Sequence, residues 1–332
     1  MRVKWERVPV QTAGGIVTGI APVIVSASRA TDIPAFYGEW FAARLAAGYL
    51  AWTNPYNRRR QVVSFSGTRM VVFWTKNPAP FERHLDLLDE RGINYYFTFT
   101  VNDYEREGLE GAVPPLGERL TAFRRISQRL GSERIVWRFD PIIVGGALTP
   151  ERILEKIRRI GDQLQGHTNK LIVSFADVSR YRGVREQLKR CGTGTWQEPG
   201  PGAVLQIAQG IQRLNEGWGF AVATCAEQVD LSAFGVAHGR CIDDGLMARV
   251  FAHDAGLMAF LGRGVAPLLA GGDLLVHPLK DRGQREACGC IASKDIGRYT
   301  TCPHRCAYCY ANTSFREADD AFARHEPGGE GL

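Results

Sequence analysis

The sequence predicts an α/β protein built as a full or partial (β/α) barrel. Short apolar runs rich in β-branched and aromatic residues alternate with amphipathic helical segments. Repeated strand–helix units of this kind imply a parallel sheet with right-handed crossovers. Nearly every expected strand also runs into polar or charged residues before its helix begins. Because barrel enzymes form their active face from these strand ends, this pattern favours a barrel over an open sheet.

Six runs have the length and composition of strands buried on both faces. They span residues 23–27, 70–74, 94–101, 134–139, 171–175 and 220–224. The helices between them have recognisable ends. Thr149 and Pro150 suit an N-cap and a first helical residue, and Gly131 and Gly166 follow the last apolar positions of two helical faces.

We expect one barrel domain over residues 1–287, interrupted by a hairpin near 48–66, where two short apolar pieces flank a turn. Residues 288–316 form a cysteine-bearing segment of the same domain. Residues 317–332 are expected to be a flexible tail, because the ending Pro327-Gly328-Gly329 offers no apolar surface to pack.

Composition limits the functional classes. A chain of 332 residues with 45% hydrophobic content can bury a full-size core, and its net charge of +6 is only mildly basic. Nucleic acid is therefore an open but not a favoured partner. No run is long enough to cross a membrane. Glycines interrupt the apolar stretch 14–27, which leads into a strand rather than forming a signal peptide. The expected compartment is the cytoplasm.

Five of the eight cysteines lie after residue 287, and the strongest signal is Cys302-Pro-His-Arg-Cys306-Ala-Tyr-Cys309. A disulfide framework suits small secreted chains, so metal ligation is the better interpretation. Three thiolates on a tight loop suit a [4Fe–4S] cluster and leave one iron without a protein thiolate. That iron is free to bind a substrate or cofactor. The alternative is a zinc site formed by the three cysteines and His304.

The spacing Cys-x-x-x-Cys-x-x-Cys, with Tyr308 before the last cysteine, resembles the radical S-adenosylmethionine (radical SAM) superfamily. More closely, the chain resembles an uncharacterised bacterial family of unknown function that carries this motif at its C-terminus. The segments that carry this closer resemblance are Ser28-Arg-Ala-Thr-Asp-Ile-Pro-Ala-Phe36, Phe73-Trp-Thr-Lys-Asn-Pro78, Trp137-Arg-Phe-Asp-Pro141, Cys288-Gly-Cys290 and Asp295-Ile-Gly297. Superfamily members usually carry the motif after the first strand, so the resemblance implies a permuted barrel.

The resemblance also implies an activity. A [4Fe–4S] cluster on Cys302, Cys306 and Cys309 would bind S-adenosylmethionine at its open iron, with Tyr308 at the adenine pocket. Reductive cleavage would give methionine and a 5′-deoxyadenosyl radical, which abstracts hydrogen from a substrate that the sequence does not name. A flavodoxin- or ferredoxin-like electron donor is implied as a partner.

A second set of cysteines comprises Cys225, Cys241, Cys288 and Cys290. Four thiolates could hold an auxiliary [4Fe–4S] cluster or a zinc ion, and the alternative is that they are small buried hydrophobes. Cys191 has no evident role.

Charged residues at the strand ends are further candidates. Arg138 and Asp140 end an otherwise apolar strand. Arg138 either forms an internal ion pair with Asp140 or Asp177, or binds a carboxylate of S-adenosylmethionine or of the substrate. Lys76 is a similar candidate, and Glu227 could ligate a metal or accept a proton. For cofactor binding the candidates are Tyr308, Arg29, Asp32 and Asp177.

If the motif faces a barrel mouth, the C-terminal segment must return to the sheet. We expect residues 291–296 to add a strand parallel to 23–27. Two alternative functions remain: a non-catalytic iron–sulfur or zinc protein with a structural or redox role, and a radical enzyme that acts on nucleic acid, such as a DNA lesion lyase or an RNA modifier.

Overall fold

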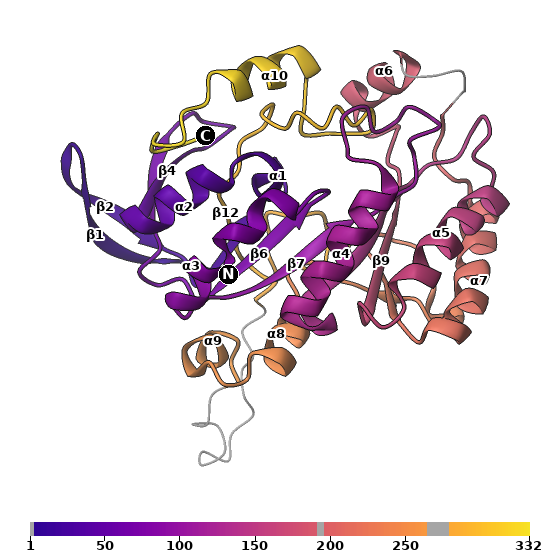
Figure 1. Ribbon diagram of the computed structural model, residues 1–332, viewed down its shortest axis with the longest axis horizontal. Coiled ribbons are helices and arrows are strands. Elements are labelled where there is room, and N and C mark those ends of the chain that lie inside the picture. The colour runs from indigo at the N-terminus through magenta and orange to yellow at the C-terminus, as the bar shows by residue number, and fades with distance from the viewer. Residues whose placement is uncertain (1–2, 191–195, 264–278) are drawn as a thin grey trace.

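The computed structural model describes residues 3–190, 196–263 and 279–332. Its centre is a parallel sheet of eight strands in the order β11-β10-β9-β8-β7-β6-β3-β12 (Figure 1). The strands are β3 (Ile24–Ala27), β6 (Met70–Thr75), β7 (Asn94–Thr100), β8 (Ile135–Ile142), β9 (Lys170–Phe175), β10 (Ala221–Thr224), β11 (Ala237–His238) and β12 (Lys294–Asp295). All six strands predicted from the apolar runs are present. The two-residue strand β11 is too short to leave such a run.

The order of the strands in this sheet is mostly sequential, as a barrel requires. Going from β3 to β11, each strand lies beside the one before it in the chain, and the last strand, β12, lies on the other side of β3. A doubly wound sheet instead reverses direction at its centre. In the described part of the chain no strand pairing joins β11 to β12. The parallel α/β sheet is thus confirmed, whereas closure into a barrel stays a prediction.

The predicted return of the C-terminal segment is confirmed. Strand β12 pairs with β3 in parallel, with Lys294 opposite Val25 and Asp295 opposite Ser26. The backbone N–H of Ile296 donates to the carbonyl of Ser26 at 3.1 Å. Just beyond, Gly297 passes so close to Ser28 that an added Cβ would overlap the serine side chain. A residue without a side chain is therefore required at this contact.

Ten α-helices occur in the described residues. They are α1 (Ile33–Phe36), α2 (Gly38–Ala47), α3 (Leu85–Glu90), α4 (Leu116–Leu130), α5 (Pro150–Leu164), α6 (Arg182–Arg190), α7 (Pro201–Trp218), α8 (Asp244–Val250), α9 (Ala255–Phe260) and α10 (Phe315–Ala323). Thr149 caps α5 through the N–H of Arg152, with Pro150 at the first turn, as the sequence predicts. None of these helices has the length and apolar content that a membrane crossing requires.

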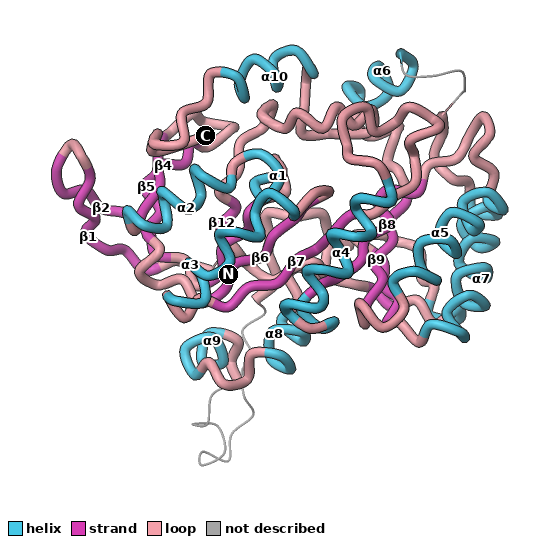
Figure 2. Tube along the Cα trace, in the orientation of Figure 1, coloured by secondary structure: helices cyan, strands magenta, loops and turns pink. Residues whose placement is uncertain are grey.

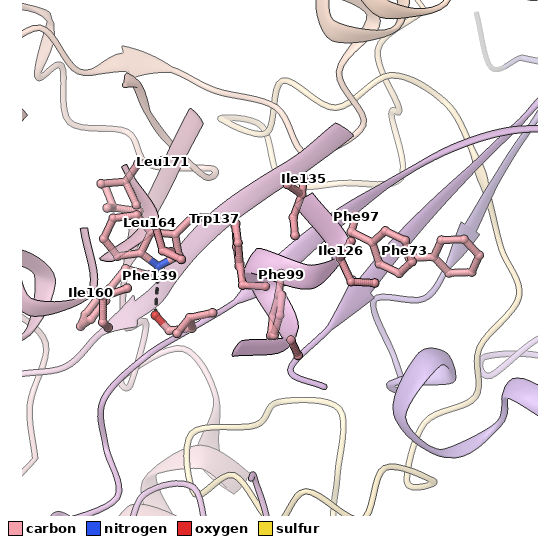
Figure 3. Packing of buried hydrophobic residues seen from close by; sticks show 14 of the residues in the cluster. Phe73, Phe97, Phe99, Ile126, Ile135, Trp137, Phe139, Ile160, Leu164 and Leu171 are labelled. Atoms are coloured by element: carbon pink, nitrogen blue, oxygen red, sulfur yellow. Dashed lines mark hydrogen bonds between the residues drawn. The ribbon is translucent and has the colours of Figure 1, made fainter. Parts of the chain in front are cut away.

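Alternate residues of the strands face two different cores. Phe97, Phe99 and Trp137 pack against Ile126 of α4 and Ile160 of α5 (Figure 3). Burying each such side chain contributes about 1.5–3 kcal/mol. The strand residues of the opposite face are Ile24, Met70, Val72, Tyr96, Val136 and Ile172, and they pack with Cys241, Cys288 and Cys290. The second cysteine set therefore packs on the face of the sheet opposite to α4 and α5, which is called the inner face below.

A second sheet lies at one end of the molecule (Figure 1). Its strands are β1 (Glu6–Thr12), β2 (Gly15–Ala21), β4 (Tyr49–Thr53) and β5 (Arg60–Ser64), in the order β1-β2-β5-β4. Strands β4 and β5 form an antiparallel hairpin in the region 48–66. The hairpin of β1 and β2 was not expected, because the Gly-rich stretch after residue 14 gives no clear alternation.

The C-terminal tail differs from expectation. Residues 315–323 form α10, capped by Ser314, and the chain beyond it lies against α2 and β4. Trp40 donates to the carbonyl of Gly329 at 3.1 Å, and the N–H of Ala51 donates to that of Glu330 at 2.7 Å. The Gly- and Pro-rich composition predicts a flexible tail, because it offers no apolar side chains that could pack. It did not indicate that backbone carbonyls would supply the contacts.

Candidate functional site

The Cys302–Cys309 loop is held by backbone hydrogen bonds at the C-terminal ends of the strands. It belongs to the segment between β12 and α10, which is irregular throughout (Figure 2). The N–H of Ala307 donates to Leu109, and the N–H of Ala112 donates to His304, at 2.9 and 3.0 Å. The loop after β7 thus pairs with the cysteine loop in antiparallel fashion and fixes its position beside β3, β6 and β7.

The three thiols of the loop are free; Cys306 is buried, and Cys302 and Cys309 are half-buried. Burial raises the pKa of each of them, and Lys76 opposes this shift at Cys306 and Cys309. The three also lie within electrostatic range of one another. In the described residues no three His, Cys, Asp or Glu side chains already stand in the geometry of a metal site. The loop supplies three thiols, the donor type that iron–sulfur clusters use, and these thiols are not in coordination geometry.

A buried network of charges lies beside the thiols. Lys76 Nζ lies 2.7 Å from Glu110 Oε1 and donates to the hydroxyl of Tyr308 at 2.8 Å. Tyr308 in turn donates to Glu110, while Asn102 donates to Tyr308 at 3.1 Å. Arg119 lies 3.4 Å from the second oxygen of Glu110. The predicted candidates Lys76 and Tyr308 are thus joined through a carboxylate.

Glu110 is the residue that sequence reasoning missed. It lies in the irregular stretch before α4, outside any strand end, so no local pattern marks it. Its side chain is fully buried. Burial alone would raise the pKa of Glu110, but Lys76 and Arg119 outweigh it and lower the pKa to about 2. A charged carboxylate at this depth is stable only because its partners are present.

Asp32 has a structural role in addition to its expected place at the mouth. One of its oxygens caps α1 through the N–H of Ala35 at 3.0 Å. The other accepts from the N–H of Lys76 at 2.7 Å and is hydrogen-bonded to His304 Nε2 at 2.8 Å. Asp32 therefore anchors the cysteine loop to β6. The other ring nitrogen of His304, Nδ1, lies 3.4 Å from the carbonyl oxygen of Ala112, so both ring nitrogens face protein oxygens.

Arg29 lies further along the same edge. Its guanidinium stacks over the ring of Trp74 at 5.0 Å, and its backbone N–H donates to Asp295 at 2.9 Å. One terminal nitrogen, NH2, has no hydrogen-bond partner among the described residues. Tyr310 lies within electrostatic range of both Arg29 and Cys309. Arg29 therefore has one buried donor group without a partner among the described residues, and its guanidinium lies within electrostatic range of Cys290 and Cys241.

Arg138 is engaged inside the protein. It forms an ion pair with Asp140, which also accepts from Ser174, and it donates to Cys241 Sγ. The internal ion pair with Asp140 is therefore present. Asp177 pairs with Arg285 instead of Arg138.

Glu227 accepts from the N–H of Phe175 at 2.9 Å at the end of β9, and burial raises the pKa of its carboxyl group. Cys225 lies close by, and its sulfur is 3.4 Å from that of Cys241. The second cysteine set is therefore brought together by the fold, on the inner face of the sheet. Cys191 lies outside the described residues.

A cavity of about 330 Å³ lies on the outer side of the loop. Tyr37, Arg298 and Thr301 line it together with residues of α10 and the chain end. Its lining contains no cysteine, so we do not place the reactive site there.

The fold and the site define an α/β protein with a parallel sheet and a loop of three free, partly buried thiols at the C-terminal strand ends. A family model described as "Domain of unknown function (DUF1848)" matches residues 24–311, and the chain belongs to this family. The matched region contains all eight strands of the large sheet and both cysteine sets. No curated protein and no solved structure gave a match.

The Glu110 network gives a stability prediction. Glu110→Gln leaves Lys76 and Arg119 without their buried partner, so we expect the free energy of unfolding to fall by about 3–5 kcal/mol at pH 7. Because the pKa of Glu110 lies below its ordinary value of 4.5, its stabilisation is present above about pH 4.5 and is lost as pH falls toward 2. The free energy of unfolding of Glu110→Gln should therefore lack the decrease that Glu110 causes as pH falls from about 4.5 toward 2.

Urea unfolding followed by circular dichroism measures both effects. The matched control is Glu155→Gln, which removes an exposed pair with Arg152 and should change stability by less than about 1 kcal/mol. Equal stability losses in the two variants would contradict the buried-network interpretation.

Proposed function

We propose that the chain is a radical SAM enzyme that carries a [4Fe–4S] cluster on Cys302, Cys306 and Cys309. The observation that supports this most is the placement of the three-thiol loop. Strand β12 returns the C-terminal segment to β3, and the loop then follows at the strand ends. In a barrel order of strands this edge is where catalytic groups gather. A closed or nearly closed barrel is part of the proposal.

When bound, such a cluster supplies reductive cleavage of S-adenosylmethionine to methionine and a 5′-deoxyadenosyl radical. The chain's own residues hold and shape the site. Lys76 places a positive charge near Cys306 and Cys309, which favours their thiolate forms. Asp32 and the backbone pairing with residues 109–112 fix the loop.

Arg29 is the residue we assign to carboxylate binding, either of S-adenosylmethionine or of the substrate. Its NH2 group is buried and has no partner among the described residues, whereas Arg138 is already paired with Asp140. A guanidinium with a free donor can bind a carboxylate with two hydrogen bonds. Tyr308 packs edge-on against Tyr104 with its hydroxyl in the Glu110 network, so its ring forms one wall of the site.

The cysteine triad gives the test of this function. Anaerobically reconstituted protein should bind iron and sulfide and, when reduced, convert S-adenosylmethionine to 5′-deoxyadenosine. The combined variant Cys302→Ala, Cys306→Ala and Cys309→Ala should lose one cluster of iron and all turnover. Iron analysis, visible absorption and chromatography of the nucleoside measure these outcomes.

The matched control is Cys191→Ser, a cysteine that belongs to neither set, and this variant should retain both the cluster and the turnover. A protein that binds the cluster but does not cleave S-adenosylmethionine would support the structural or redox alternative. Zinc in place of iron at these three cysteines would overturn the proposal.

A second candidate function is a radical reaction on nucleic acid. Tyr310, half exposed next to Cys309, stacks with Tyr181 at a ring distance of 5.5 Å. The exposed Arg180, Arg182 and Arg185 flank this pair. Exposed aromatic rings beside arginines can stack bases and contact phosphates. This surface, the Tyr181–Tyr310 pair with its three arginines, is what favours the candidate.

If nucleic acid is the substrate, Tyr181→Ala should weaken the binding of a single-stranded oligonucleotide roughly 5- to 100-fold, since stacking contributes about 1–3 kcal/mol per base. Tyr181→Phe should bind like the unchanged protein. Fluorescence anisotropy at several salt concentrations measures the affinity, which should fall steeply with salt. Affinity that is absent, or insensitive to both salt and Tyr181, would exclude this candidate.

A further inference from the structure

Four cysteines from three separate segments meet on the inner face of the large sheet. Cys225 follows β10, Cys241 follows β11, and Cys288 and Cys290 precede β12. Cys241, Cys288 and Cys290 are buried, together with Met70, Val72 and other apolar residues of the strands. None of the four takes part in the loop proposed to hold the radical cluster, so the two sites can be considered independently.

Two of the four sulfurs lie close together, and backbone N–H groups donate to a third. Cys225 Sγ lies 3.4 Å from Cys241 Sγ. Cys290 Sγ accepts from the N–H groups of Cys241 and Ile242, at 3.2 and 3.4 Å. Backbone N–H donors directed at a sulfur stabilise it as a thiolate, which is the form that binds metal.

Two glycines allow this approach. An added Cβ at Gly289 would lie 2.8 Å from the carbonyl oxygen of Gly239, and one at Gly239 would overlap the carbonyl of Thr224. The strand end that leads to Cys225 and the loops that carry Cys241 and Cys288–Cys290 are therefore packed backbone to backbone. Side chains at either glycine would push the cysteine segments apart.

Two arginine side chains also place positive charge near these four cysteines. Arg138 donates to Cys241 Sγ, and Arg29 lies within electrostatic range of Cys290 and Cys241. Each arginine also contacts a carboxylate, Asp140 and Asp295 respectively. Four thiolates around a divalent ion would carry a net charge of about −2, which two nearby guanidinium groups would partly offset.

We propose that Cys225, Cys241, Cys288 and Cys290 bind one structural zinc ion. A tetrahedral zinc site with Zn–S bonds of about 2.3 Å holds its sulfurs about 3.8 Å apart. The thiolates around a [4Fe–4S] cluster are instead roughly 6 Å apart. The 3.4 Å separation of Cys225 and Cys241 is close to the zinc value. Four protein thiolates complete the coordination, which makes the ion structural rather than catalytic.

The position of this site gives the ion a role. Among the described residues no strand pairing joins β11 to β12. The four cysteines span this gap, since Cys225 and Cys241 come from the β10–β11 side and Cys288 and Cys290 from the β12 side. Hydrogen bonds already join the two sides, since Ile291 N–H donates to the carbonyl of Ile242 and Cys290 Sγ accepts from Cys241 and Ile242. A zinc ion would add a stronger link between them. No three described side chains stand in coordination geometry yet, so binding requires the cysteine side chains to rotate about their Cα–Cβ bonds.

Metal analysis of the full-length chain tests the proposal. We expect about one zinc per chain in protein purified with or without oxygen. Cys241→Ser and Cys290→Ser should lose it, whereas the combined alanine variant of Cys302, Cys306 and Cys309 should retain it. This last variant separates the zinc site from the proposed radical function, because it removes only the latter.

If the serine variants do not fold, the unchanged protein still gives an answer. A mercurial reagent should release zinc as the thiols react, and zinc-edge X-ray absorption should show four sulfur neighbours. Iron and sulfide retained by the combined alanine variant would overturn the proposal. So would a Cys225–Cys241 disulfide found by mass spectrometry, or four reactive thiols with no metal.

Discussion

The contact between β12 and β3 is the constraint on which the rest of the structure depends, because it brings the end of the chain to its beginning. Two residue pairs form the ladder, and side chains reinforce it. Ser26 and Ser293 share a hydrogen bond at 2.6 Å, and Trp52 donates to the carbonyl of Gly297 at 3.2 Å. Each of these hydrogen bonds contributes only about 0.5–1.5 kcal/mol, so their number matters.

The arrangement of the polar side chains at the strand ends depends on this return of the C-terminal segment to the sheet. Without β12, the cysteine loop would not be brought to the edge where Asp32, Lys76 and Asn102 follow β3, β6 and β7. With it, a lysine, a tyrosine and a carboxylate can be buried together, because each supplies the partner that the others need. The second cysteine set depends on the same return, since Cys288 and Cys290 immediately precede β12.

Local patterns predicted the parts of the fold that are local. The six apolar strands, the cap of α5 and the parallel return of the C-terminal segment could all be read from spacing and composition. Glu110 could not, because its importance comes from Lys76, Arg119 and Tyr308, which are distant in sequence. Asp32 is a similar case, because two of its partners are also distant in sequence. Its position after a strand was predicted, but the sequence does not show that α1, the residue after β6 and His304 all bind its two oxygens. The folded tail depends on donors from α2 and β4 that no tail residue reveals.

The central claim is that Cys302, Cys306 and Cys309 leave one iron open toward the strand ends. Electron paramagnetic resonance of the reduced, reconstituted protein tests it most directly. We predict a cluster signal whose g values shift when S-adenosylmethionine is added, because the added amino and carboxylate groups ligate the open iron. A cluster signal that S-adenosylmethionine leaves unchanged would contradict the claim.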